Sequence, residues 1–219
     1  MEKISFSDII IVSCGTLNLE LNHLKQEGFL DVQKIYYTKP GLHQNCHELE
    51  NQLISRIKMA REKADKVIVV YGGKFCYVNV DEPTRTMQKL IGEQGAGIGR
   101  VQATHCMDML ADETARDRIA QELADGEKVW WMTPGWLEYR YQVFEGWDQG
   151  IANENFPKHT GGAIVLDGIG YVDKFMAEKP EEFLEYCDWM GIPMQAYPVS
   201  LDRFKSLLLD QAKILQESC

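Results

Sequence analysis

Three cysteines follow predicted strands, and their thiols are the groups in this chain best suited to chemistry. Cys14 ends an apolar run, and Cys76 lies five residues beyond Tyr71, at the end of the clearest strand pattern. Cys106, preceded by His105, follows a short fourth strand. Because ligands of open α/β sheets bind outside the carboxyl ends of the strands, we expect these thiols to converge at one sheet edge.

Zinc binding is the chemistry that this set of residues favours. Zinc takes three or four Cys and His ligands at about 2.0–2.3 Å and keeps one position open when it is catalytic. Cys14, Cys76 and Cys106, with His105 in reserve, match that ligand set. A thiolate-rich zinc binds a substrate thiol and lowers its pKa, which prepares the thiol for alkyl transfer. The chain has no CxxC pair, so only the fold can assemble the site, and the competing interpretation is buried cysteines that act as small hydrophobes.

Two other functions remain open at this point. In the first, Cys14 is a metal-free nucleophile whose pKa is lowered at a helix start, and His105 is its base. In the second, the protein is non-catalytic and holds a corrinoid or an iron–sulfur cluster for a partner. The residues alone therefore leave open whether the chain is an enzyme.

A second group of candidates follows the predicted second strand. Asn45 and Glu48 have the spacing of a capping box, which explains both as a helix start. His43 comes just before them, after a Pro-Gly turn, and is expected to point toward the same cleft and contribute to binding. Cys46 is a weaker candidate for the same site.

The aromatic segment at residues 130–136 contains a predicted helix start. Thr133 followed by Pro134 is a favourable start, so the backbone amides of Gly135 and Trp136 would be available to bind an anion. The glycine-rich stretches at residues 72–74 and 95–99 lack the spacing of phosphate-binding and dinucleotide-binding loops.

The elements that must position these residues alternate between strand and helix. Short apolar runs predict strands at residues 8–13, 32–37, 66–71, 100–103, 128–132, 163–166 and 195–199. Amphipathic helices separate them, which predicts parallel pairing through right-handed crossovers. We therefore expect an α/β fold with a mainly parallel sheet and helices on both faces, similar to a Rossmann fold. Residues 1–219 are expected to form one domain, with a possible boundary to a small carboxyl-terminal lobe near residues 151–162.

Composition excludes several classes of protein. The 219 residues carry 23 basic and 33 acidic side chains, a net charge of −10, which argues against binding to nucleic acid. No apolar run approaches the ~20 residues of a membrane helix, and no export signal is recognisable, so a cytoplasmic location and no membrane partner are expected. The six cysteines are then thiols or ligands rather than disulfides. Cys187, inside a predicted helix, and Cys219, the last residue, are read as structural or incidental.

The order of several short motifs resembles the domain-of-unknown-function 1638 family. These motifs are Ser13-Cys14-Gly15-Thr16-Leu17 with Glu20, Leu42-His43, Tyr71-Gly72 with Cys76, His105-Cys106-Met107-Asp108 and Met132-Thr133-Pro134-Gly135-Trp136. Cys76 stands further from its Tyr-Gly pair than the family pattern implies. The resemblance implies anaerobic one-carbon metabolism beside corrinoid-dependent methyl transfer, with a small molecule or a corrinoid protein as partner. The function expected is thus a zinc-dependent alkyl or methyl transfer, or an accessory role in it.

Overall fold

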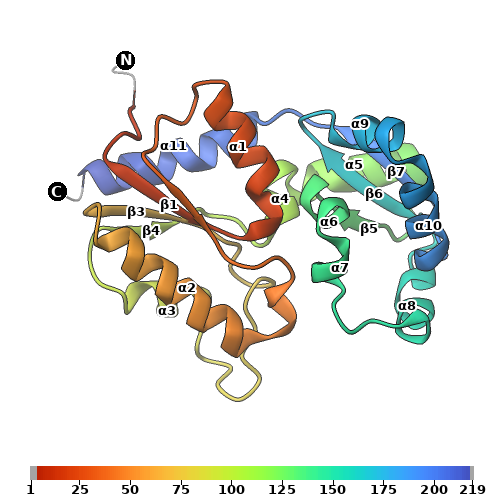
Figure 1. Cartoon of the computed structure of the whole chain (residues 1–219), viewed down its shortest axis with the longest axis horizontal. Helices are drawn as coiled ribbons and strands as arrows, with labels where there is room; N and C mark the ends of the chain where they lie inside the picture. The colour runs from red at the N-terminus through yellow and green to blue at the C-terminus, as the bar shows by residue number, and fades with distance from the viewer. Residues whose placement is uncertain (1–3, 218–219) are drawn as a thin grey trace.

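Two β-sheets, each built of parallel strands, lie side by side in the computed structural model, which describes residues 4–217 (Figure 1). The first sheet has the strand order β2 (Ile35–Tyr37), β1 (Ile9–Ser13), β3 (Lys66–Val70) and β4 (Ile98–Arg100). The second has the order β5 (Trp130–Met132), β6 (Ala163–Asp167) and β7 (Met194–Pro198). The expected α/β class with parallel strands is confirmed, and the strands divide between two sheets instead of continuing in one.

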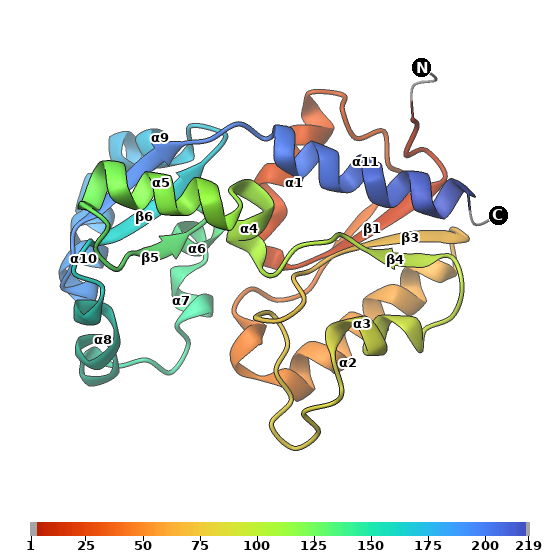
Figure 2. The ribbon, with the colours of Figure 1, turned by 180° about the vertical axis from the view of Figure 1, so that it is seen from behind.

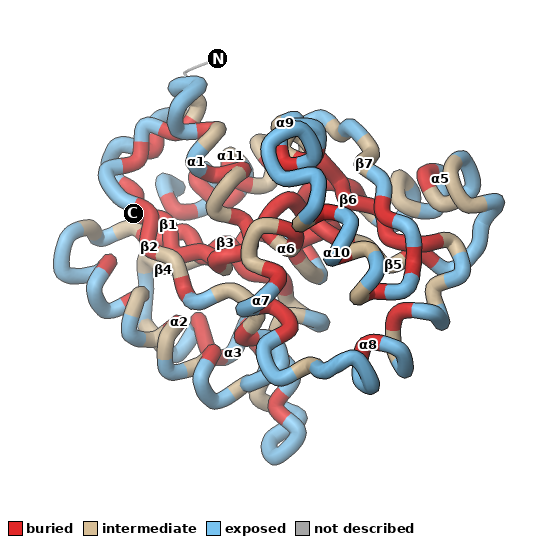
Figure 3. Tube along the Cα trace, turned by 45° about the vertical axis from the view of Figure 1, so that its right-hand side comes forward, coloured by how far each residue is buried: buried red, intermediate tan, exposed pale blue. Residues whose placement is uncertain are grey.

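The first sheet is buried on both faces because its central strands are apolar at nearly every position. Side chains of β1 alternate between two cores: Ile9 and Ile11 face one side, and Ile10 and Val12 face the other. Helices α1 (Asn18–Gln26) and α11 (Asp202–Glu217) cover the first face, while α2 (Cys46–Arg61) and α3 (Met87–Gly92) cover the second. Each sheet with its covering helices forms one lobe of the molecule. Figure 3 shows β1 and β3 of the first lobe and β6 of the second as continuous buried segments.

The second sheet is covered in the same way. Helix α5 (Glu113–Ala124) packs on one face, and α9 (Tyr171–Glu178) and α10 (Pro180–Met190) pack on the other, as Figure 2 shows from behind. Ile164 and Leu166 of β6 belong to the same apolar cluster as Ile9 of β1, so one core continues from lobe to lobe. Among residues 4–217, no helix is both long and apolar enough to cross a bilayer.

The chain passes between the lobes at other points than the sequence suggested. Residues 151–162, the expected boundary, lie inside the second lobe and include most of α8 (Gln149–Asn155) and η3 (Phe156–Lys158). Their loose composition marks the turn into β6, where Gly162 has a φ of 78°. The crossings instead occur between α4 (Cys106–Leu110) and α5, and again before α11. The helix predicted to start at Thr133 and Pro134 is divided at Tyr139 into α6 (Pro134–Glu138) and α7 (Arg140–Val143).

Helix α2 begins as the capping pattern predicts. The Asn45 Oδ1 atom accepts a hydrogen bond from the Glu48 backbone amide at 3.0 Å. We expect Asn45→Ala to lower the free energy of unfolding by about 1 kcal/mol, because that amide loses its partner. Urea unfolding measures the loss, and Asn45→Ser should recover most of it. Equal losses in the two variants would contradict a capping role.

Candidate functional site

The structure brings Cys14, Cys76 and Cys106 together at the carboxyl end of the first sheet. Cys14 directly follows β1, Cys76 lies in the loop after β3, and Cys106 is the first residue of α4. Each of the three thiols acts electrostatically on the others: Cys14 raises the pKa of Cys76, and both raise the pKa of Cys106. The backbone amides of Gly72 and Cys106 also donate toward the Cys76 sulfur. Thiols from three separate strand ends therefore share one site.

Burial is the main influence on all three thiols. It raises the pKa of Cys14, raises that of Cys76 to about 12, and raises that of Cys106 well above its usual value. Cys14 and Cys76 keep part of their surface in contact with solvent, whereas Cys106 is only 7% exposed. In the absence of a cation the three groups are therefore neutral thiols at pH 7, because each thiolate would be poorly solvated and close to two others.

Polar neighbours hold the thiols in their present orientations. The Cys14 Sγ lies 3.1 Å from the Thr16 Oγ1 and also contacts the hydroxyl of Tyr71. The Cys106 Sγ lies 3.1 Å from the Met107 Sδ, and the Trp136 indole points toward it. Within residues 4–217 no three His, Cys, Asp or Glu side chains stand in a metal-binding arrangement. Cys14 and Cys106 must therefore turn away from their present partners before the three sulfurs can hold a common ion.

His105 does not join the thiols. Its Nδ1 accepts a hydrogen bond from the Asp108 backbone amide at 3.1 Å and thereby caps α4, while its ring packs on Phe75. Burial, with a contribution from Arg116, lowers the pKa of His105 to about 4, so the ring is neutral and carries its proton on Nε2. His105, which the sequence suggested as a reserve zinc ligand or as a general base, therefore has a structural role.

His43, Gly135 and Trp136 meet where the two lobes touch. The His43 ring stacks on Trp136, with centroids 5.4 Å apart, and burial lowers the pKa of His43. The Trp136 amide, however, donates to the Thr133 carbonyl at 2.9 Å, and Gly135 lies directly against the backbone of Thr16. The start of α6 therefore packs one lobe onto the other, and the anion site expected there is not formed.

The other cysteines lie apart from this site. Cys46 begins α2 and packs against the core between α2 and the first sheet, and Cys187 lies in α10 against the core of the second lobe. Neither contributes to the pKa of Cys14, Cys76 or Cys106. Cys219 is outside the described residues. Cys46 and Cys187 thus provide matched controls for experiments on the three-cysteine site.

Glu20 is a candidate that residue-by-residue sequence reasoning did not single out. It lies in the first turn of α1, is fully buried, and neither carboxyl oxygen has a hydrogen-bond partner among the described residues. Burial, reinforced by Asp167 at the end of β6, raises the pKa of Glu20 to about 8. Glu20 also acts electrostatically on Cys14. An acidic residue in a first helical turn normally lies in solvent and interacts favourably with the helix dipole. The sequence therefore gives no sign that Glu20 is buried, and only the fold reveals it.

Comparison with known proteins agrees with the motif resemblance. A family model described as protein of unknown function (DUF1638) matches residues 37–208, which is most of the chain. The chain belongs to the DUF1638 family. The matched region of this DUF1638 protein includes Cys76, Cys106 and the start of α6, and it begins beyond Cys14. No curated protein and no solved structure matches the chain.

Proposed function

We propose that this DUF1638 protein binds one zinc ion through Cys14, Cys76 and Cys106 and uses it to activate the thiol of a small substrate. The observation that carries the proposal is the mutual electrostatic coupling of three thiols from three strand ends. Among the groups that influence these thiols, only Arg100 contributes a positive charge, and it acts on Cys76. A divalent cation would supply the charge that lets all three ionise.

The chemistry of the donor set fits zinc, because soft thiolates are preferred zinc ligands and three of them leave a fourth position open. Zinc held in this way would lower the pKa of a substrate thiol. The chain's own residues then orient the site: Thr16 and Tyr71 position the Cys14 sulfur, and the Trp136 indole shields Cys106. A zinc-bound, activated substrate thiol is what alkyl transfer requires. Together with the family resemblance, this supports a role in cytoplasmic one-carbon metabolism with a corrinoid protein as partner.

The structure favours this proposal over a metal-free cysteine nucleophile. Such a mechanism needs a lowered thiol pKa and an adjacent base. Here burial raises the pKa of Cys14, and His105 is engaged as the cap of α4. The thiol that ends β1 therefore lacks the activation that a nucleophile of this kind requires.

Elemental analysis of protein purified anaerobically and without chelators tests the proposal. We expect about one zinc per chain in the parent, because three thiolates form a complete catalytic-type ligand set. The variants Cys14→Ser, Cys76→Ser and Cys106→Ser should each bind zinc at least ~100-fold more weakly in a chelator competition, since losing a ligand costs more than losing its outer partner. Cys46→Ser and Cys187→Ser should bind zinc as the parent does.

Three outcomes would contradict the proposal. Parent protein with well under one zinc per chain removes it, and so does equal loss of zinc in the control variants. A strong visible absorption band together with iron or cobalt in the elemental analysis would indicate that the protein binds an iron–sulfur cluster or a corrinoid instead of zinc. Circular dichroism of every variant separates loss of a ligand from loss of the fold.

A further inference from the structure

A cavity of about 710 Å³ beside the thiol site has cationic but no anionic side chains in its lining. The loop after β3 and the start of α3 form its walls, and Arg100 of β4 lies at its side. Lys74, Arg85 and Arg100 line it, and no Asp or Glu does so among the described residues. The rest of the lining is largely apolar and includes Tyr77 and Met87. This charge distribution is unusual in a chain with a net charge of −10 and points to an anionic ligand.

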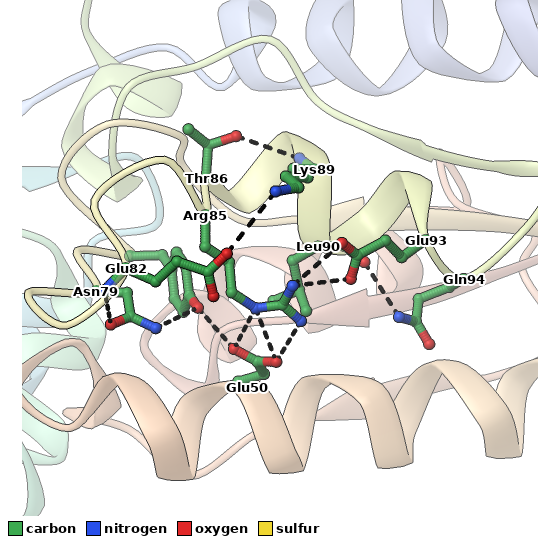
Figure 4. Close-up of polar contacts among 10 residues, drawn as sticks. Glu50, Asn79, Glu82, Arg85, Thr86, Lys89, Leu90, Glu93 and Gln94 are labelled. Carbon is green, nitrogen blue, oxygen red and sulfur yellow. Dashed lines mark hydrogen bonds and ion pairs between the residues drawn. The ribbon is translucent and has the colours of Figure 1, made fainter.

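Arg85 is not the source of uncompensated positive charge in the cavity. Its guanidinium is held between the carboxylates of Glu50 and Glu93, with nitrogen–oxygen distances of 2.5 and 3.0 Å, as Figure 4 shows. Lys89 and Glu82 form a further pair at 3.8 Å on the same side of the loop. The charges around α3 are therefore largely compensated, and the uncompensated charge of the cavity resides in Lys74 and Arg100.

Arg100 is a buried cation without a carboxylate partner in the described part of the chain. It is 8% exposed, and its Nη1 donates to the carbonyls of Tyr71, Val101 and Ala103 at 3.1, 2.7 and 3.0 Å. These three bonds fix the guanidinium plane. Its Nε is buried without a partner, and its Nη2 makes no hydrogen bond to the described residues. A buried charge without a counter-ion raises the free energy of the folded protein. An anionic ligand that pairs with Arg100 would remove this cost.

The unpaired side of Arg100 has the shape of a carboxylate receptor. Nε and Nη2 present two parallel N–H groups, which match the two oxygens of a carboxylate. Gly73 borders this side: a Cβ added to it would lie 3.3 Å from the Arg100 Nη2. A side chain at position 73 would therefore crowd the edge that glycine leaves open. This gives Gly73 a role that the spacing of the glycine-rich stretch at residues 72–74 did not suggest.

We propose that the cavity binds a small organic acid whose carboxylate pairs with the Nε and Nη2 groups of Arg100. Lys74 provides a second, exposed cation at the rim, and Tyr77 and Met87 contact the apolar body of the acid. The ligand would lie next to the three-cysteine site, because the charge of Arg100 acts directly on the Cys76 thiol. This inference goes beyond the proposed zinc chemistry and does not depend on it.

Binding of hexanoate to the metal-free full-length protein tests this inference by calorimetry, with hexan-1-ol as the uncharged comparator. We expect saturable binding of hexanoate and at least ~10-fold weaker binding of hexan-1-ol, because only the acid pairs with Arg100. Arg100→Lys keeps the charge but loses the two-pronged geometry, and should weaken hexanoate binding about 10-fold. Gly73→Val should weaken it to a similar degree by crowding Nη2, and Lys74→Gln about 2- to 3-fold, as for an exposed charge.

Two variants serve as controls. Lys89→Gln removes a neighbouring charge that does not line the cavity, and Gly92→Ala adds a methyl group in open space; both should bind hexanoate as the parent does. If Arg100→Lys does not fold, Gly73→Val still decides the question, because it leaves the guanidinium in place. Equal affinity for hexanoate and hexan-1-ol, or unchanged affinity in Gly73→Val, would overturn the proposal. Tighter binding of inorganic phosphate than of hexanoate would overturn the assignment to a carboxylic acid.

Discussion

Replacing Glu20 by glutamine is expected to remove a pH dependence of stability between pH 4.5 and 8. The folded protein keeps the Glu20 carboxyl protonated up to a pKa of about 8, whereas the unfolded chain releases the proton near the ordinary value of 4.5. In that window the folded state binds more protons, so the free energy of unfolding falls as pH rises. The contribution of Glu20 is fully present below pH 4.5 and is lost as pH passes 8. Its size is on the order of 5 kcal/mol, from a difference of roughly 3.5 pKa units.

Urea unfolding of the parent and Glu20→Gln at pH 5, 6.5 and 8 measures this effect. The stability of the variant relative to the parent should increase steadily from pH 5 to pH 8. Glu113→Gln, which changes an exposed acid in the first turn of α5, should follow the pH profile of the parent. Parallel profiles for the parent and Glu20→Gln would show that this carboxyl ionises normally in the folded protein.

Gly135→Ala is expected to weaken the contact between the two lobes severely. A Cβ at this position would overlap the Thr16 carbonyl, a backbone group that cannot turn aside as a flexible side chain does. The same carbonyl accepts a hydrogen bond from the Thr133 Oγ1 at 3.2 Å, so relieving the overlap also strains that bond. We expect the free energy of unfolding to fall by about 3 kcal/mol, at the upper end of overpacking effects.

Denaturant unfolding gives the stability of Gly135→Ala, and zinc competition gives a second readout. Because Thr16 also contacts the Cys14 sulfur, displacement of its backbone should weaken zinc binding as well. Gly92→Ala is the control, since its added methyl group meets no atom within 4 Å. A Gly135→Ala protein as stable as the parent would mean that the lobes can separate at this point at little cost.

Local sequence patterns predicted the elements well because their causes are local. Continuous apolar runs indicate strands covered on both faces, and Asn45 with its amide partner starts α2 as its residue type requires. The placement of Cys14, Cys76 and Cys106 beyond the ends of β1, β3 and β4 also followed, because it depends only on where parallel strands end. None of these patterns contains information about which strands pair, so the division into two sheets was not predictable from them.

The misassigned and missed site residues are those whose partners lie far away in the chain or whose function depends on one atom. His105 looked like a ligand, but the use of its Nδ1 as a helix cap is visible only in the structure. Glu20 is buried because the second lobe packs against α1, an arrangement with no local signal. Arg100 is likewise buried by segments that come before and after it, and its missing counter-ion is a property of the assembled fold.

Helix α11 links the folding of the first lobe to a segment that is synthesised only after the second lobe. Its side chains Phe204, Leu208 and Ala212 fill the same core as Ile9 and Ile11 of β1. On the ribosome, this face of the first sheet stays incomplete while the whole second lobe is made, and such transiently exposed apolar surface promotes aggregation. Contacts between sequence positions so far apart also slow folding. The amino-terminal lobe therefore depends on the arrival of residues 202–217, and the Cys106 thiol, which belongs to the core that α11 completes, remains open to oxidation until then.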